Sequence, residues 1–156
     1  MKRVLSWLCL IIALAALPKT AHAASIPGDL YLSYKIDGGS WHFGNKMTKS
    51  GTTWTYTLPE TTSSNVEFAI NTVEASNENG LKQGSTQYCR GDNKVGTAEV
   101  DATTTLYLYG STDHWLKYNK AGKHTFSLKT TSGESSGYVN LQLDITTDGG
   151  LSLIHI

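Results

Sequence analysis

Apolar and polar residues alternate with a period of two along most of the chain, and the spacing of an amphipathic helix is nearly absent. Such alternation is typical of β-strands that bury one face. The alternating segments span 29–36, 52–59, 65–73, 103–110, 123–130 and 137–146, and a further short strand is expected at 87–89. Turn-forming residues, such as Asp37-Gly38-Gly39 and Ala121-Gly122, separate these segments. The pattern predicts an all-β protein built as an antiparallel β-sandwich, with a closed barrel as the less favoured alternative.

The first 23 residues do not follow this pattern. A basic start (Lys2, Arg3) precedes an apolar run over 4–17, and Ala21-His22-Ala23 follows it. This order is typical of a secretory signal peptide that is cleaved after Ala23. The run of about 14 residues is shorter than the about 20 residues that a membrane-spanning helix needs, so an N-terminal anchor is the less favoured alternative. We therefore expect a secreted protein, located in the periplasm, at the cell surface or outside the cell.

The rest of the chain is long enough for one domain with its own core. We expect residues 24–28 to be a short linker and residues 29–150 to form an immunoglobulin-like β-sandwich of about seven to eight strands after the cleaved signal peptide, 1–23. Residues 151–156 are interpreted either as a last edge strand or as a spurious tail, because they resemble a translated sequencing adapter. On the second interpretation the sequence is a fragment, and the natural protein continues with further domains.

The net charge and the cysteine content limit the classes of function that we expect. Removal of the three basic residues of the leader leaves ten basic and thirteen acidic residues, a net charge of −3 without any run of like sign. Nucleic-acid binding requires a basic stripe and is not expected. Cys89 is the one cysteine after the leader, so the mature chain has no internal disulfide. We expect a buried, inert thiol rather than a bridge to another chain or a nucleophile.

The segment Gly-Gly-Ser-Trp-His-Phe-Gly-Asn-Lys, 38–46, interrupts the strand pattern and is expected to be an aromatic loop. Sugars present apolar C–H faces and polar hydroxyls, so a sugar site needs an exposed aromatic plane with hydrogen-bonding groups around it. Trp41 and Phe43 are two positions apart and share a face if the chain is extended, with His42 opposite. Asn45 and Lys46 would supply hydrogen bonds at the rim.

A second segment, 111–120, repeats these residue types with Trp115 and Tyr118. The two halves of the chain can be aligned so that Trp41 matches Trp115, which reflects either a duplication or the common chemistry of strand and loop. The alternative function for both tryptophans is to close the ends of the sandwich. Trp54 alternates in phase with its apolar neighbours and is expected in the core.

Residues 29–146 resemble the sandwich domains of glycan-binding outer-membrane proteins from bacterial starch-utilisation systems, and the starch-binding modules fused to amylases. The resemblance is carried by Met47, Gly51, Trp54 and Tyr56 in one hairpin, by Phe68, and by Ala121, Gly122, Thr125, Phe126 and Leu128. It implies glycan binding without catalysis. The chain departs from the pattern where Phe-Asn-Gly-Trp is replaced by residues 37–44, and the lipoprotein cysteine after the leader is missing.

The sequence shows only weak residue patterns for catalysis or metal binding. His42, His114 and His124 lack the close spacing of metal ligands, so no metal or cofactor is expected. No Ser–His–Asp order stands out in the sequence, and its acidic residues mostly lie in turn-like surroundings, so no catalytic residue is assigned.

Two candidate functions are consistent with the sequence. The first is a secreted, non-catalytic carbohydrate-binding domain for an α-glucan or another polysaccharide or oligosaccharide, with other domains or outer-membrane proteins as further partners. Its predicted binding residues are Trp41, His42, Phe43, Asn45, Lys46, Trp115 and Tyr118. The alternative is a structural or adhesive β-sandwich module of a cell-surface protein that has no small-molecule site.

Overall fold

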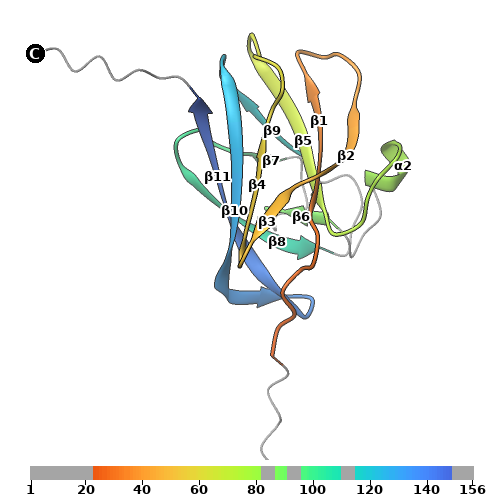
Figure 1. The fold of residues 1–156 in the computed structure, drawn as a ribbon, viewed down its shortest axis with the longest axis vertical. Helices are drawn as coiled ribbons and strands as arrows, with labels where there is room; N and C mark the ends of the chain where they lie inside the picture. The colour runs from red at the N-terminus through yellow and green to blue at the C-terminus, as the bar shows by residue number, and fades with distance from the viewer. Residues whose placement is uncertain (1–22, 82–86, 91–95, 110–114, 149–156) are drawn as a thin grey trace, which may run out of the picture.

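A computed structural model describes residues 23–81, 87–90, 96–109 and 115–148 of the chain. Figure 1 shows strands packed side by side in a twisted body, with the short helix α2 (Glu78–Leu81) lying outside, beside β2. Strands dominate the described residues, so the all-β prediction is confirmed. No helix in the described residues is long and apolar enough to span a membrane.

Eleven strands pair into one nearly closed sheet, and nine of them follow a continuous path. Its order is β2-β1-β5-β6-β8-β11-β10-β4-β3, with β7 and β9 off the path. The strands are β1 (Tyr31–Ile36), β2 (His42–Lys46), β3 (Thr48–Ser50), β4 (Thr53–Thr57), β5 (Asn65–Asn71), β6 (Gln87–Cys89), β7 (Gly96–Thr97), β8 (Thr103–Tyr109), β9 (Leu116–Asn119), β10 (Lys123–Ser135) and β11 (Tyr138–Asp148). All the pairings on the path are antiparallel, and β7 pairs with β9 in parallel.

One face of most strands fills the core, as the alternation predicts. The large, fully buried side chains include Tyr34, Trp54, Phe68, Tyr88 and Phe126. Trp54 is 0% exposed and donates its indole N–H to the carbonyl of Gly28 at 3.0 Å, so its predicted place in the core is confirmed. Cys89 is also buried, as expected.

The two ends of the strand path are separated by a single residue. Met47, 2% exposed, lies between β2 and β3, and its main-chain N–H bonds to the carbonyl of Leu30. Because β2 pairs with β1 and β3 pairs with β4, the chain passes at Met47 from one sheet edge to the other. The buried methionine therefore fixes a corner of the sandwich, directly after the segment that carries Trp41.

The prediction of a loop over 38–46 is wrong for part of that segment, because His42–Lys46 form β2. The number of strands is correspondingly higher than the seven to eight expected, and β2, β3, β7 and β9 account for the excess. These short strands are held by hydrogen bonds to a neighbouring strand, and they carry too few apolar residues for period-two alternation to reveal them.

The residues on either side of the predicted domain are only partly described. The expected linker at 24–28 forms a bridge from Ser25 to Tyr138, and Val139 donates its N–H to the Ser25 carbonyl. The predicted signal sequence, apart from Ala23, and the tail at 151–156 lie outside the described residues.

Candidate functional site

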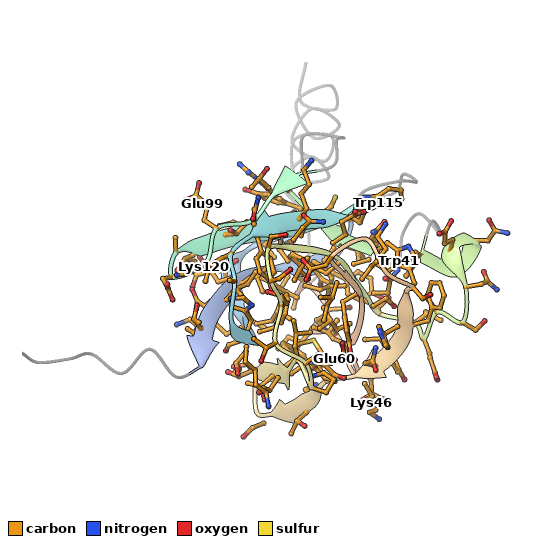
Figure 2. The ribbon with its side chains drawn as sticks, turned by 90° about the horizontal axis from the view of Figure 1, so that it is seen from above. Trp41, Lys46, Glu60, Glu99, Trp115 and Lys120 are labelled. Carbon is orange, nitrogen blue, oxygen red and sulfur yellow. The ribbon has the colours of Figure 1, made fainter. Side chains whose placement is uncertain are left out.

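Three aromatic rings from two distant parts of the sequence meet on the outer face of the β1–β2–β5–β9 sheet. Trp41 and Phe43 are nearly parallel, with ring centroids 6.1 Å apart and 20° between their planes. Trp115 approaches Trp41 edge-on, with centroids 6.2 Å apart and planes at 70°. All three side chains are partly exposed. We call Trp41, Phe43 and Trp115 the aromatic cluster; Figure 2 shows its two tryptophans on the same side of the molecule.

The aromatic cluster rests on a small apolar layer that is separate from the main core. Ala69 of β5, Ala75 and Leu81 of α2 are buried beneath the three rings. Alternation along β5 places Ala69 on the outer face, since Phe68 and Ile70 lie in the main core. The small side chain at position 69 leaves room for rings to lie against the sheet, so the cluster is a supported surface rather than a set of loose side chains.

A charged pair borders the cluster. The Lys35 ammonium lies 5.4 Å from the centre of the Trp41 ring and 3.2 Å from Oε1 of Glu67. Such a cation adds an attraction to the ring and limits its rotation. Both charged side chains are mostly buried, with 22% and 23% exposure, and they place hydrogen-bonding groups beside the aromatic surface. Sequence reasoning missed them, because their proximity to Trp41 depends on the pairing of β1 with β5.

Asp37 holds the base of the turn that leads to Trp41. Its carboxylate accepts hydrogen bonds from the main-chain N–H groups of Ser63, Ser64 and Asn65 and from both serine hydroxyls, at 2.7–3.1 Å. The bonds from the N–H groups of Asn65 and Ser63 are the main reason that the pKa of Asp37 lies below its usual range. The turn after β1 is thereby fastened to the start of β5.

The remaining predicted binding residues lie elsewhere. His42 stacks on Tyr34, with ring centroids 4.8 Å apart, on the opposite side of the strand from Trp41 and Phe43. The Asn45 amide bonds to the carbonyls of Leu32 and His42. These two side chains support β2, and the structure does not bring them to the aromatic cluster.

Lys46 and Tyr118 also face other partners. The Lys46 ammonium pairs with Asp29 at 2.7 Å, and this hydrogen bond raises the pKa of Lys46. Tyr118 is only 2% exposed, and its hydroxyl hydrogen-bonds to Nδ1 of His124 at 3.0 Å. Burial raises the pKa of Tyr118. Tyr118 is therefore not part of the aromatic cluster.

A second concave region lies between β7 and β8. This pocket of about 400 Å³ is lined by polar side chains, including Arg90, Glu99, Thr104 and Tyr107. Sequence analysis gave no signal for it, because its residues come from separate segments without a shared motif. Among the described residues, no three His, Cys, Asp or Glu side chains gather closely enough to hold a metal ion.

Comparisons with known proteins identify no family. No family model matches the chain, and no curated protein matches it. Among solved structures, a starch-binding domain described as "Ligand induced structure of AmyP-SBD" matches with a TM-score of 0.40 and 16% sequence identity, over 85% of this chain and 82% of that chain. At this TM-score and identity, the function has to be argued from the residues of the site.

Proposed function

We propose that the protein is a secreted, non-catalytic carbohydrate-binding domain that takes an α-glucan or another polysaccharide on the aromatic cluster. The observation that carries this proposal is the convergence of Trp41, Phe43 and Trp115, partly exposed, on one supported surface. Export is part of the proposal and is supported by the signal pattern of residues 1–23.

The geometry suits a sugar ring. Trp41 and Phe43 stack on each other with nearly parallel planes, and a partly exposed ring face of this stack can take the C–H face of a pyranose, with Trp115 edge-on to Trp41. Lys35 and Glu67 supply a donor and an acceptor beside this surface. A ring stacked on Trp41 would therefore keep its hydroxyls within reach of polar groups.

The carboxylates of a further pocket, different from the one between β7 and β8, favour a binding function over a catalytic one. Asp101 and Asp144 both line a pocket of about 530 Å³, and glycoside hydrolysis needs one carboxyl group with a raised pKa as its acid. Asp101 instead pairs with Lys120, and that hydrogen bond lowers its pKa. Asp144 accepts a hydrogen bond from the Thr103 hydroxyl at 2.6 Å. The lowered pKa makes Asp101 a poor general acid.

The test is to replace Trp41 and measure polysaccharide binding. Affinity electrophoresis of residues 24–156 in gels that contain starch, or cellulosic, xylan and mannan polymers, gives retardation constants. We expect Trp41→Ala to weaken binding by roughly 2 kcal/mol, about 30-fold, because a central stacking tryptophan behaves as a hot spot. Tyr138→Ala is the matched control, since Tyr138 is an exposed aromatic residue outside the cluster.

Folding has to be verified in the same samples, because Trp41 also packs on Ala69 and Leu81. Circular dichroism and the melting temperature establish that each variant is folded before its retardation is compared. Retardation that is unchanged in folded Trp41→Ala, or equally reduced in Tyr138→Ala, would contradict the proposal. A protein that binds none of the polymers would instead support the structural or adhesive function.

A further inference from the structure

The sheet that carries the aromatic cluster forks along β5. The first half of β5 pairs with β9 through residues 65–68, and its end pairs with β6 through Ile70 and Asn71. One branch of the sheet continues from β9 to β7, and the other continues from β6 to β8. The pocket of about 400 Å³ lies between these two branches.

The fork leaves part of a strand edge without a neighbouring strand. Residues 103–106 of β8 pair with β11 on one side, but only residues 107–109 pair with β6 on the other. Within the described ranges, no strand pairs with the second edge of residues 103–106. Main-chain donors and acceptors of β8 therefore face the pocket.

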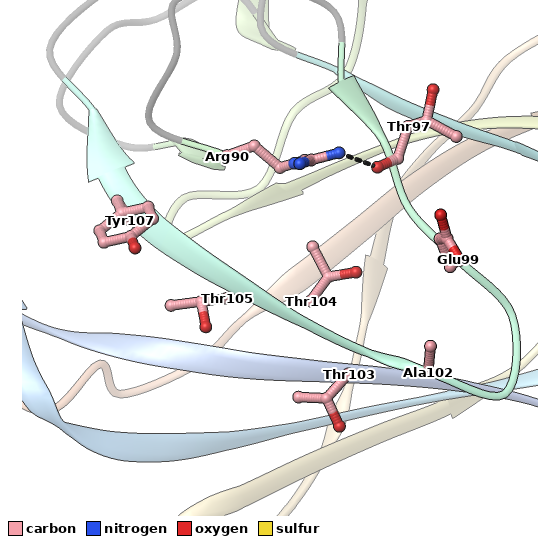
Figure 3. A pocket seen from close by; sticks show the side chains of 8 residues that line it. All are labelled: Arg90, Thr97, Glu99, Ala102, Thr103, Thr104, Thr105 and Tyr107. Atoms are coloured by element: carbon pink, nitrogen blue, oxygen red, sulfur yellow. Dashed lines mark hydrogen bonds between the residues drawn. The ribbon is translucent and has the colours of Figure 1, made fainter.

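Arg90 crosses the fork and shapes the pocket. Its side chain lies against Gly96, where a Cβ atom would be 2.8 Å from the Arg90 Cδ, and its Nη1 donates to the Thr97 carbonyl at 2.6 Å. Figure 3 shows Arg90, Thr97, Glu99 and Thr104 on the same side of β8. The hydrogen bond to Thr97 of β7 fixes the Arg90 guanidinium. Its other N–H groups can donate hydrogen bonds to a ligand.

Several polar groups of this pocket have no partner among the described residues, although Arg90 and Thr103 do. Within the described part of the chain, the Glu99 carboxylate has no ion-pair partner, and the hydroxyls of Thr97, Thr104 and Tyr107 make no hydrogen bond. By contrast, the carboxylate of Asp37 and the amide of Asn45 are bonded within the fold. The pocket gathers donors and acceptors without internal partners around a volume that suits a small polar molecule.

We propose that this pocket is a second glycan subsite, which binds one pyranose unit of a neutral polysaccharide by hydrogen bonds rather than by stacking. Vicinal hydroxyls each donate and accept, so they match the guanidinium of Arg90 and the carboxylate of Glu99, which line the same pocket. The carboxylate disfavours an anionic sugar. For its ligand class, this proposal rests on the proposed function of the aromatic cluster.

The pocket and the aromatic cluster are connected through β7 and β9. Gly96 contacts Arg90 on one side and pairs with Leu116 on the other, and Leu116 directly follows Trp115. A polysaccharide that engages both sites gains avidity that a single pyranose does not. The second site would therefore show most strongly with long chains.

The experiment is a titration of ¹⁵N-labelled residues 24–156 with maltoheptaose, followed at the main-chain amides of residues 103–106 and at the Trp41 indole. Tri-galacturonate serves as the anionic comparison. The test variant is Glu99→Gln/Thr104→Val, which keeps side-chain size. Its control is Glu60→Gln/Thr61→Val, which makes the same changes at exposed positions that do not line this pocket.

We expect maltoheptaose to shift the amides of residues 103–106 in the wild type, in the control and in Trp41→Ala. In Glu99→Gln/Thr104→Val these shifts should weaken at least fivefold in affinity, while the Trp41 indole still responds. Amides that stay unmoved while the Trp41 indole shifts would overturn the second subsite and leave the proposed function intact. Silence at both places with malto-, cello-, xylo- and manno-oligosaccharides alike would overturn both, and stronger binding of tri-galacturonate would overturn the neutral ligand class.

Discussion

At the residue scale, single polar side chains hold the segments on either side of Trp41 and Phe43 in place. Asp37 fastens the turn before Trp41 to β5, and Asn45 ties β2 to the carbonyl of Leu32. The residue types of the site were visible in the sequence, since Trp41, Phe43 and Trp115 stand out in polar surroundings. The supporting roles were not, because a hydrogen-bonding partner 28 residues away leaves no local pattern.

Asp37 also makes stability depend on pH. Its pKa is lower in the folded protein than its usual value, so its contribution to the free energy of unfolding is present above the usual pKa and is lost as the pH falls below about 4. We expect Asp37→Asn to lower the melting temperature at pH 7, with the difference from wild type narrowing between pH 4 and pH 2. Thermal melts across this range measure the difference.

Asparagine is the informative replacement at position 37. The φ angle of 49° there is tolerated by asparagine, so the variant removes the charge without new backbone strain. A difference in melting temperature that stays constant from pH 7 to pH 2 would show that the charge has no part in the effect.

At the element scale, the sequence predicted strands whose side chains alternate and missed strands that exist through pairing. Strands β1, β4, β5, β8, β10 and β11 bury apolar residues on one face and were expected. In β2, Gly44 and Asn45 replace the apolar positions, so that only the register with β1 reveals the strand. The same pairing places His42 on the face opposite Trp41 and Phe43, as an extended chain predicts, although His42 was among the predicted binding residues.

The close approach of β2 to the segment before α2 depends on Gly44. This residue has a φ of 61°, and a Cβ atom there would lie 2.6 Å from the Ala75 carbonyl oxygen and 2.7 Å from Cγ of Glu74. We expect Gly44→Ala to lower the free energy of unfolding by about 3 kcal/mol, measured by urea denaturation, because backbone strain and overpacking add. Polysaccharide binding should weaken as well, since Ala75 supports the aromatic cluster.

Gly51 provides the matched control for this change. Its φ of 59° is nearly the same, but nothing lies within 4 Å of the added Cβ position. Gly51→Ala should therefore cost only the strain, about 1 kcal/mol, and leave binding unchanged. Equal losses of stability in the two variants would show that the contact with residues 74–75 is unimportant.

At the scale of the whole molecule, the fold brings together Trp41 and Trp115, which lie 74 positions apart in the sequence. Trp41 follows β1 and Trp115 precedes β9, and the two strands meet through their common neighbour β5. An all-β architecture followed from the alternating pattern. The meeting of the tryptophans did not, because the order of strands in a sheet depends on pairings between distant segments.

Sugar binding at the aromatic cluster can be followed through the three tryptophans of residues 24–156. Trp41 and Trp115 lie in the aromatic cluster, whereas Trp54 is buried and bonded to Gly28. The most direct measurement is a ¹H–¹⁵N spectrum of the three indole N–H groups during titration with malto-, cello-, xylo- and manno-oligosaccharides. The account predicts that at least one series shifts Trp41 and Trp115 while Trp54 stays fixed. If none of the four series moves the Trp41 or Trp115 signal, the aromatic cluster is not a sugar-binding site.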